Sequence, residues 1–209
     1  MHADSQVSSD APATAPRRAF VALAACLLTA PAFAQSGALT VPRNLEELTE
    51  RASDIVRGTV IEARVEKHPE LTSLDTVIVR LRLRETLKGE ARDEFTFRQY
   101  LWDARDTYDA AGYRKGQDLL LLMIAPSRLG LSSPAGMGQG RFRIVRDRDG
   151  REMAVNETGN ARLFDGLGDA AKPGVALTTR QSNLIARHRG GPIAAAELSA
   201  LIRAYAEDR

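Results

Sequence analysis

Cysteine and histidine are scarce in this chain, and their scarcity excludes several kinds of site. The 209 residues include one cysteine and three histidines, and neither an H-E-x-x-H spacing nor a cysteine–histidine cluster occurs. No G-x-S-x-G sequence is present, so a serine hydrolase of the nucleophile-elbow type has no support. The formal net charge is only +2, which argues against a polyanion-binding protein. The sequence predicts no metal site, no cofactor and no catalytic residue.

Residues 1–34 have the pattern of a secretory signal peptide. Two arginines at 17–18 precede the apolar run 19–34, which ends in Ala-Phe-Ala. A basic segment, a short apolar core and a small-x-small end are typical of a signal that is cleaved, here after Ala34. The run contains a proline and is shorter than the roughly 20 residues of a membrane span. We expect an exported protein, periplasmic or secreted, with no membrane span after cleavage.

Two details leave the export route open. The arginine pair is compatible with twin-arginine export, but paired basic residues are also ordinary in the general secretory pathway. The sequence Leu-Ala-Ala-Cys26 resembles a bacterial lipobox, which would make Cys26 a lipidated first residue. The apolar residues that follow favour cleavage after Ala34 instead, and that cleavage removes the only cysteine. The mature chain 35–209 would then contain no disulfide and would depend on its core for stability.

Runs of β-forming residues dominate the first part of the mature chain. A capping-box pattern that begins at Asn44 predicts a short helix over 44–52. Gly58 marks a bulge or a close backbone approach inside the first strand. The segments predicted as strands are 55–65, 75–87, 95–99, 118–125 and the two arms of a hairpin over 142–155. The sequence therefore predicts a mainly β domain over 35–156, with a mobile loop at 127–140.

The last part of the chain has weaker signals. Residues 157–190 contain glycines and prolines without periodicity, and we expect an irregular connector. Residues 191–209 are predicted to form an amphipathic helix, because apolar side chains recur at 198, 201, 202 and 205. That apolar stripe needs a surface to cover, either the β domain or a second copy of the chain. The oligomeric state therefore stays open.

The β domain resembles a known family. Its short helix leads into a strand of the form (S/A)D-x-V-x-G-x-V, the partner strand ends in L-K-G, and a later strand reads G-x-x-L-L-L. The matching residues are Ser53, Asp54, Val56, Gly58, Val60, Leu87, Lys88, Gly89, Gly116, Leu119, Leu120 and Leu121. These motifs are similar to those of the netrin-like modules, OB-type barrels that include the N-terminal domain of the tissue inhibitors of metalloproteinases. A group of uncharacterised exported bacterial proteins has the same layout.

The resemblance covers residues 45–155 and implies a five- to six-stranded OB-like Greek-key barrel with a short N-terminal helix and a C-terminal helix. It also suggests inhibition of proteases. Those inhibitors use an N-terminal cysteine to chelate the protease zinc, whereas the predicted mature chain begins Gln35-Ser36 and lacks the family's disulfides. No functional residue of the family therefore carries over to this chain.

One basic strand face and the aromatic residues near it are the candidate binding site. Arginines alternate with apolar residues along 75–87, and aromatic residues follow the next strand, as in OB-type barrels that bind ligands on one face. The candidate residues are Arg80, Arg82, Arg84, Arg98, Tyr100, Trp102, Tyr108 and Tyr113. The alternative is a solvated outer face balanced by cross-strand pairs with Glu62, Glu66, Glu85 and Glu94. The two remaining histidines, His68 and His188, are predicted to be solvated.

Three functions from different classes follow. The first is an exported, non-enzymatic binding or accessory protein that recognises a protein partner or an anionic glycan through the loop 100–116 and the barrel rim. Nucleic acid is not expected as a partner of an exported protein. The second is a protease inhibitor by netrin-like analogy. The third is an enzyme or ligand carrier whose site assembles only in the folded chain.

Overall fold

The computed structural model describes residues 41–103, 105–167 and 175–207. All of them belong to one compact unit, residues 39–209. The predicted signal peptide and Cys26 lie outside the described residues. Within the described part of the chain, no helix has both the length and the apolar character that crossing a membrane requires.

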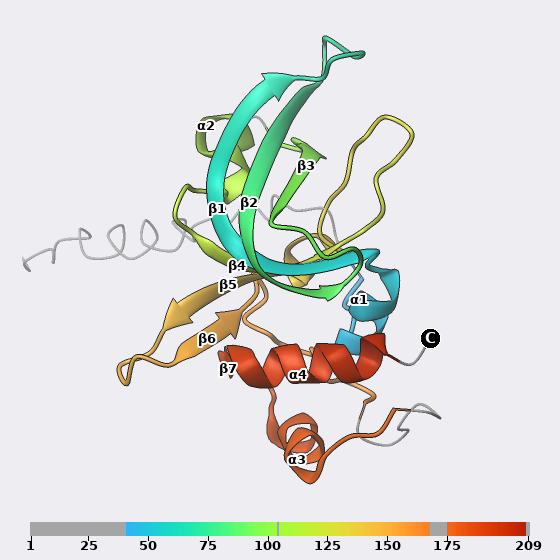
Figure 1. The fold of residues 1–209 in the computed structure, drawn as a ribbon, viewed down its shortest axis with the longest axis vertical. Coiled ribbons are helices and arrows are strands. Elements are labelled where there is room, and N and C mark those ends of the chain that lie inside the picture. Colours follow the sequence, from blue (N-terminus) through green and yellow to red (C-terminus); the bar gives the residue numbers. More distant parts are fainter. Residues whose placement is uncertain (1–40, 104, 168–174, 208–209) are drawn as a thin grey trace, which may run out of the picture. The chain divides into compact units, whose positions relative to one another are not determined.

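The central element is one antiparallel sheet of seven strands, and Figure 1 shows it with the helices that accompany it. The strand order is β3-β2-β1-β4-β5-β6-β7. The strands are β1 (Asp54–Lys67), β2 (Asp75–Lys88), β3 (Glu94–Tyr100), β4 (Asp118–Met123), β5 (Arg141–Arg146), β6 (Glu152–Val155) and β7 (Ile193–Ala194). The helices are α1 (Leu45–Arg51), α2 (Asp106–Asp109), α3 (Thr179–Arg187) and α4 (Ala195–Ala206), with short 3-10 turns at 110–112 and 137–140.

The prediction of a mainly β chain is confirmed, but the sheet differs in detail from the predicted barrel. It has seven strands rather than five or six, and it is not closed, because the end strands β3 and β7 do not pair with each other. The physical reason is that β5 pairs with β4, and the hairpin β5–β6 then extends the sheet beyond β4. The two-residue strand β7 pairs with β6 and ends it.

The loop after β4 is more ordered than predicted. Leu131 forms an isolated parallel bridge with Arg98 of β3, and Pro134 forms an antiparallel bridge with Met123 of β4. The Ser132 amide donates to the Arg98 carbonyl at 2.8 Å. This segment therefore contacts both β3 and β4, and the prediction of a mobile loop over 127–140 is wrong.

Two predicted backbone signals are confirmed in the first strands. The Asn44 side chain accepts a hydrogen bond from the Glu47 amide, and the Glu47 carboxylate accepts one from the Asn44 amide, which completes the capping box of α1. In β1, a Cβ at Gly58 would overlap the Arg82 carbonyl oxygen and lie 3.0 Å from the Leu83 Cα. The β1–β2 register shifts at this position. Gly58 therefore permits a bulge that bends the long hairpin.

Strand β4 divides the buried side chains into two clusters. Leu119, Leu121 and Met123 point to one side, and Leu120 and Leu122 to the other, as the alternation of a strand requires. All five side chains are fully buried. The continuous apolar run predicted to be buried on both sides is therefore confirmed.

The two clusters have different neighbours. The interior cluster lies within the curled sheet β1–β4 and consists of Val56, Val60, Val77, Val79, Leu81, Phe95, Phe97, Leu101, Tyr113, Leu119, Leu121 and Met123. The outer cluster joins the opposite face of the sheet to the helices. Leu45 and Leu48 of α1 and Leu198, Leu201 and Ile202 of α4 belong to it, together with Leu120 and Phe142 of the sheet.

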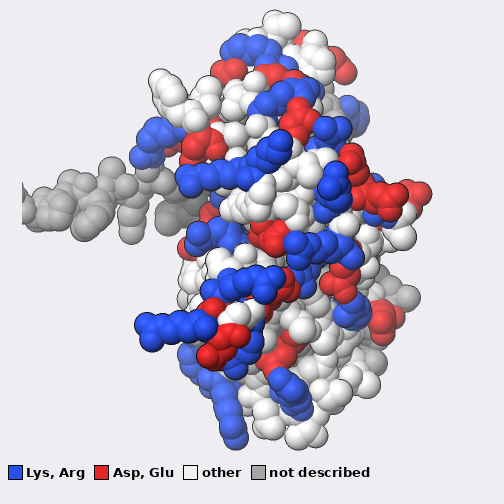
Figure 2. Space-filling view, turned by 60° about the vertical axis from the view of Figure 1, so that its left-hand side comes forward, with Lys and Arg blue, Asp and Glu red and all other residues white. Residues whose placement is uncertain are grey.

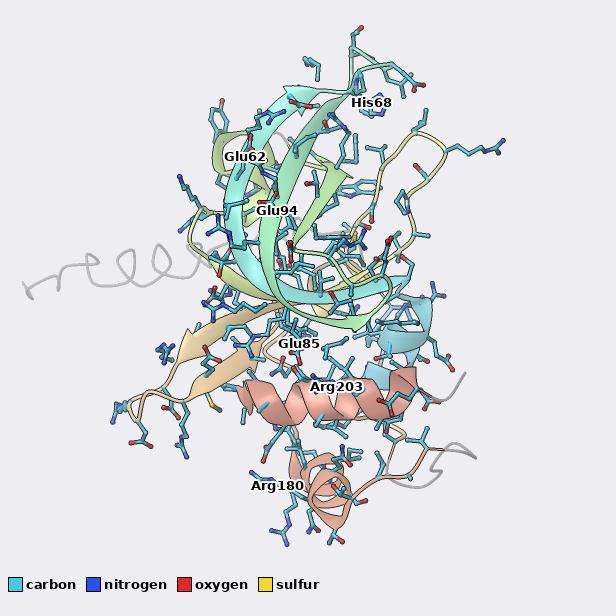
Figure 3. All side chains as sticks on the ribbon, in the orientation of Figure 1. Glu62, His68, Glu85, Glu94, Arg180 and Arg203 are labelled. Carbon is cyan, nitrogen blue, oxygen red and sulfur yellow. The ribbon has the colours of Figure 1, made fainter. Side chains whose placement is uncertain are left out.

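The C-terminal part of the chain contains two helices, one of which was not predicted. The predicted irregular connector 157–190 contains the helix α3, which begins with a capping box between Thr178 and Gln181. The sequence signal was weak because the helix buries only Ile185. Helix α4 buries its apolar stripe within the same chain, against α1, β2, β6 and β7. Arg203 of α4 also pairs with Glu85 of β2 (Figure 3).

Two buried asparagines fix the turn that follows β6. The Asn156 side-chain oxygen accepts the Asn160 amide at 2.7 Å, and its amide group donates to the Gln139 carbonyl at 3.0 Å. The Asn160 side chain donates to the carbonyls of Ala154 and Gly191 at 2.9 and 2.8 Å. These bonds join β6, the 3-10 turn 137–140 and the segment before β7.

Candidate functional site

The three arginines of β2 lie where the alternation placed them. Val77, Val79 and Leu81 point into the interior cluster, so Arg80, Arg82 and Arg84 lie on the opposite face of the strand and are exposed. On the face drawn in Figure 2, basic and acidic side chains are interspersed rather than gathered by sign. The charged outer face is defined by Arg57, Glu62, Arg80, Arg82, Arg84, Glu94, Asp118 and Glu152.

Most charges of the charged outer face are paired across strands. Arg80 lies 3.0 Å from Glu62 and 3.9 Å from Glu94, and Figure 3 labels both carboxylates beside β2. Arg84 lies 3.2 Å from Asp118 and 3.6 Å from Glu152. The pairing matches the predicted solvated face, and it means that an anionic ligand would have to displace carboxylates from these arginines.

Glu152 is the carboxylate of this face that lies near three arginines. Arg57 donates a hydrogen bond to its carboxylate, and Arg146 and Arg84 lie near it. The hydrogen bond from Arg57 lowers the pKa of Glu152, and so do the charges of the three arginines. Partial burial raises this pKa by less.

Arg82, by contrast, makes no ion pair with any residue that the structure describes, so it is the β2 arginine most available to a ligand.

Arg98 is separated from these arginines by its contacts. Its guanidinium lies 2.6 Å from the Glu66 carboxylate and donates to the Thr76 hydroxyl at 2.8 Å. The hydrogen bond from Arg98 lowers the pKa of Glu66. Since its carbonyl also accepts the Ser132 amide, Arg98 joins β1, β2 and the loop after β4. The prediction that it binds a ligand gains no support from this position.

Tyr113 lies in the interior cluster, and not at the surface as the binding-site prediction requires. It is 2% exposed, and its ring meets Phe97 edge-on with centroids 5.5 Å apart. Its hydroxyl donates to the Gln99 side chain at 3.0 Å. Burial raises the pKa of Tyr113 to about 12. The surface position expected for Tyr113 is therefore wrong, because its ring packs on Phe97 and its hydroxyl has a buried partner in Gln99.

Two of the other aromatic residues of the site are at the surface. Trp102 is 66% exposed and Tyr108 is 92% exposed. Tyr100 is half-buried and meets Trp102 edge-on with centroids 4.9 Å apart. We call Trp102 and Tyr108 the exposed aromatic residues. Large aromatic side chains at the surface are typical of protein-binding sites when they lie together.

A strained turn connects the exposed aromatic residues to Tyr113. Ala110 and Ala111 have φ values of 53° and 55°, in the left-handed region that side chains with a Cβ disfavour. Gly112 follows with φ 77°. Arg141 donates to the Ala111 carbonyl at 2.6 Å and lies 4.7 Å above the Tyr113 ring. Nothing in the local sequence marks these alanines as left-handed, so sequence reasoning missed both the turn and the role of Arg141.

The two described histidines are less solvated than predicted. His68 is 1% exposed. Its Nδ1 accepts the amides of Glu70 and Leu71 at 3.2 and 3.1 Å, so its Nε2 carries the proton and donates to the Leu129 carbonyl at 2.8 Å. His68 thus ties the tip of the β1–β2 hairpin (labelled in Figure 3) to the loop after β4. The prediction that His68 is solvated is wrong, because its ring is buried and hydrogen-bonded to the carbonyl of a residue 61 positions away.

His188 follows α3 and is half-buried. Its ring meets Phe164 edge-on, with centroids 5.4 Å apart. Its Nε2 finds no hydrogen-bond partner among the residues described. Burial lowers the pKa of His188, and the neighbouring Arg189 lowers it further. His188 therefore favours the neutral form, and the prediction of a solvated side chain is wrong here too.

One polar cavity lies beside the start of α1. Its volume is about 140 Å³, and its lining consists of Pro42, Arg43, Asn44, Glu47, Arg162 and Asp165. This is smaller than the roughly 300 Å³ at which small-molecule pockets begin, and the lining arginines and carboxylates balance in charge. Elsewhere in the described ranges, no three histidine, cysteine or acidic side chains gather closely enough to hold a metal ion.

The predicted site residues thus divide into three groups. Arg80, Arg82 and Arg84 stay together on the charged outer face. The exposed aromatic residues and the half-buried Tyr100 form a second group, and Arg98 and Tyr113 are held by internal contacts.

No protein-family model matches the chain, and neither a curated protein nor a solved structure matches it.

Proposed function

We propose that this chain is an exported, non-enzymatic binding or accessory protein that recognises a protein partner through the exposed aromatic residues. The observation that carries the proposal is the exposure of Trp102 and Tyr108, 66% and 92%, on a loop whose far end is anchored in the core by Tyr113. Leaving two large aromatic side chains in water forgoes the free energy of their burial. Aromatic residues are also enriched at the centres of protein interfaces.

We further propose that β1–β4 and residues 131–135 form an OB-type barrel of the netrin-like kind. The parallel bridge between Leu131 and Arg98 and the antiparallel bridge between Pro134 and Met123 support this proposal. The Ala135 amide also donates to the Leu122 carbonyl at 2.7 Å. A segment that pairs with β3 on one side and β4 on the other would complete a ring around the interior cluster. The loop that carries the exposed aromatic residues would then lie at the rim.

The charged outer face supports a protein partner better than an anionic glycan. Its arginines at 80 and 84 already have carboxylate partners, so a polyanion would gain few new pairs. The exposed aromatic residues, by contrast, present most of their surface to solvent. This contrast favours recognition of an apolar or aromatic protein surface.

A photo-crosslinking experiment in an extract of the exported proteins tests the proposal. The variant W102A/Y108A removes two exposed aromatic side chains. The matched control R82Q/R143Q removes two exposed charges that make no ion pair with a described residue. We expect the wild type and the control to crosslink the same protein and W102A/Y108A to lose it. Equal crosslinking by all three proteins would contradict the proposal. Loss in the control together with binding of a sulfated glycan would favour the charged outer face instead.

A further inference from the structure

Three consecutive residues before Tyr113 adopt left-handed backbone conformations. Ala110, Ala111 and Gly112 have φ values of 53°, 55° and 77°. Glycine enters this region freely, but alanine has a Cβ that clashes there and no side-chain polar group to compensate. Such a conformation persists only where surrounding contacts hold it. Hydrogen bonds within the loop, such as the one from the Ala110 amide to the Asp106 carbonyl, hold part of this turn, and contacts from outside the loop supply the rest.

Arg141, at the start of β5, supplies the principal contacts. Its Nη1 donates to the Ala111 carbonyl at 2.6 Å, and its guanidinium lies 4.7 Å above the Tyr113 ring. Its other terminal nitrogen pairs with Glu157. The Arg141 side chain is 19% exposed and the Glu157 side chain 48%, so the arginine is partly shielded from water and its carboxylate partner is not. Within the loop, Asp109 accepts the Gly112 amide at 3.2 Å.

Gly138 makes room for Glu157, the partner of Arg141. A Cβ at Gly138 would overlap the Glu157 carboxylate and lie 2.8 Å from its Cβ. On the other side of the ion pair, a Cβ at Gly112 would lie 3.5 Å from the Arg141 guanidinium, an ordinary van der Waals contact. Segments far apart in the sequence therefore converge on one half-buried arginine.

We propose that Arg141 and Glu157 form a latch that fixes the loop 105–113 in one conformation and so presents Tyr108 to a partner. The significance of the latch rests on the proposed function, because it regulates the same loop. While the latch is closed, a partner meets an ordered loop and the entropic cost of binding falls. When it opens, Ala110 and Ala111 relax out of the left-handed region and Tyr108 loses its fixed position.

Amide hydrogen exchange on the free full-length protein tests the latch. In R141Q, we expect the amides of residues 110–113 to exchange about tenfold faster or more than in wild type, because local opening no longer breaks the Arg141 contacts. The matched control is R143Q, which changes an exposed arginine two residues along the same strand. Equal exchange in R141Q and R143Q would overturn the proposal. Urea unfolding of each variant separates local opening from global destabilisation.

Two further variants keep the test decisive if R141Q does not fold. E157Q removes only the ion pair and leaves the Arg141 bond to Ala111 in place, so we expect a smaller acceleration at the same amides. A111G relieves the disfavoured φ, and we expect slower exchange than in wild type. No change in E157Q together with faster exchange in A111G would overturn the latch.

The outcomes remain separate from those of the proposed function. Hydrogen exchange is measured without any partner, so equal exchange in R141Q and R143Q would contradict the latch without affecting the crosslinking result. Likewise, crosslinking that does not depend on Trp102 and Tyr108 would contradict the proposed function without affecting the exchange result.

Discussion

The two sides of the curled sheet β1–β4 hold charged and polar groups in different ways. On the interior side, Tyr113, Gln99 and the neighbouring Arg141 are few, shielded and fixed by specific partners. On the charged outer face, arginines and carboxylates are numerous and mostly more exposed, and Arg80 and Arg84 each pair with two neighbours. A buried polar group has no water to replace a lost partner, whereas an exposed one does. We therefore expect single substitutions to matter far more on the interior side.

The largest effect should come from the apolar residues of the interior side. Leu121 is fully buried in β4. Replacing it with alanine should lower the free energy of unfolding by about 2–5 kcal/mol, because transfer free energy is lost and a cavity remains. Urea denaturation measures the change. L121M keeps the volume and should cost less than about 1.5 kcal/mol, and equal losses in both variants would contradict tight packing of this cluster.

Next in size is the polar contact within the same cluster. Y113F removes the hydroxyl that donates to Gln99 and leaves a buried side-chain oxygen without a partner. We expect a loss of about 1–3 kcal/mol in the free energy of unfolding. Y108F is the matched control, since Tyr108 is 92% exposed and should unfold as the wild type does. Identical denaturation midpoints for Y113F and Y108F would contradict the expectation that buried polar contacts contribute more to stability than exposed groups.

Substitution on the charged outer face should have a smaller effect. R84Q removes the pairs with Asp118 and Glu152 at 3.2 and 3.6 Å. Because the Arg84 side chain is 51% exposed, we expect a loss of at most about 1 kcal/mol. At about 1 M salt, where charges more than roughly 3 Å apart are screened, the difference from wild type should shrink. If R84Q lowered the free energy of unfolding as much as L121A does, the pairs of Arg84 would not behave as exposed ion pairs.

The smallest effect concerns the acid of the same face. The Arg57 contact lowers the pKa of Glu152 below its ordinary 4.5. A lowered acid pKa stabilises the folded chain fully above pH 4.5, and this contribution disappears as the pH falls through the folded-state pKa. E152Q should therefore lose stability at pH 7, by under about 1 kcal/mol for a partly exposed pair, and should differ less from wild type near pH 3. If the difference in unfolding free energy between E152Q and wild type stayed constant from pH 7 to pH 3, ionisation of Glu152 would not be its source.

Much of the sheet was predictable because its signals are local. Alternation along 75–87 separated the arginines of β2 from its buried valines, and the capping box at Asn44 began α1 one residue later. The bulge at Gly58 followed from a glycine inside a strand pattern. Helix α3 escaped prediction, since its cap at Thr178 lies beside glycines and prolines and its single buried residue gives no stripe.

The candidate site was predictable only in part. Exposure of Trp102 and Tyr108 agrees with a polar loop, but the same loop buries Tyr113, and no local pattern distinguishes these aromatic residues. The alanines at 110 and 111 are ordinary in sequence, so no local signal predicts their left-handed turn or its hydrogen bond with Arg141, 30 residues away. His68 likewise gained its burial from a carbonyl 61 residues away.

The sequence by itself determined the strand segments, the sides of β2 and β4, and the amphipathic character of α4. These follow from side-chain periodicity and capping, which act over a few residues. Only the tertiary structure decided that β5 pairs with β4, that the stripe of α4 is covered within one chain, and that Arg141 contacts the loop 105–113. Burial and strain depend on which distant segments meet, and that pairing is a property of the whole fold.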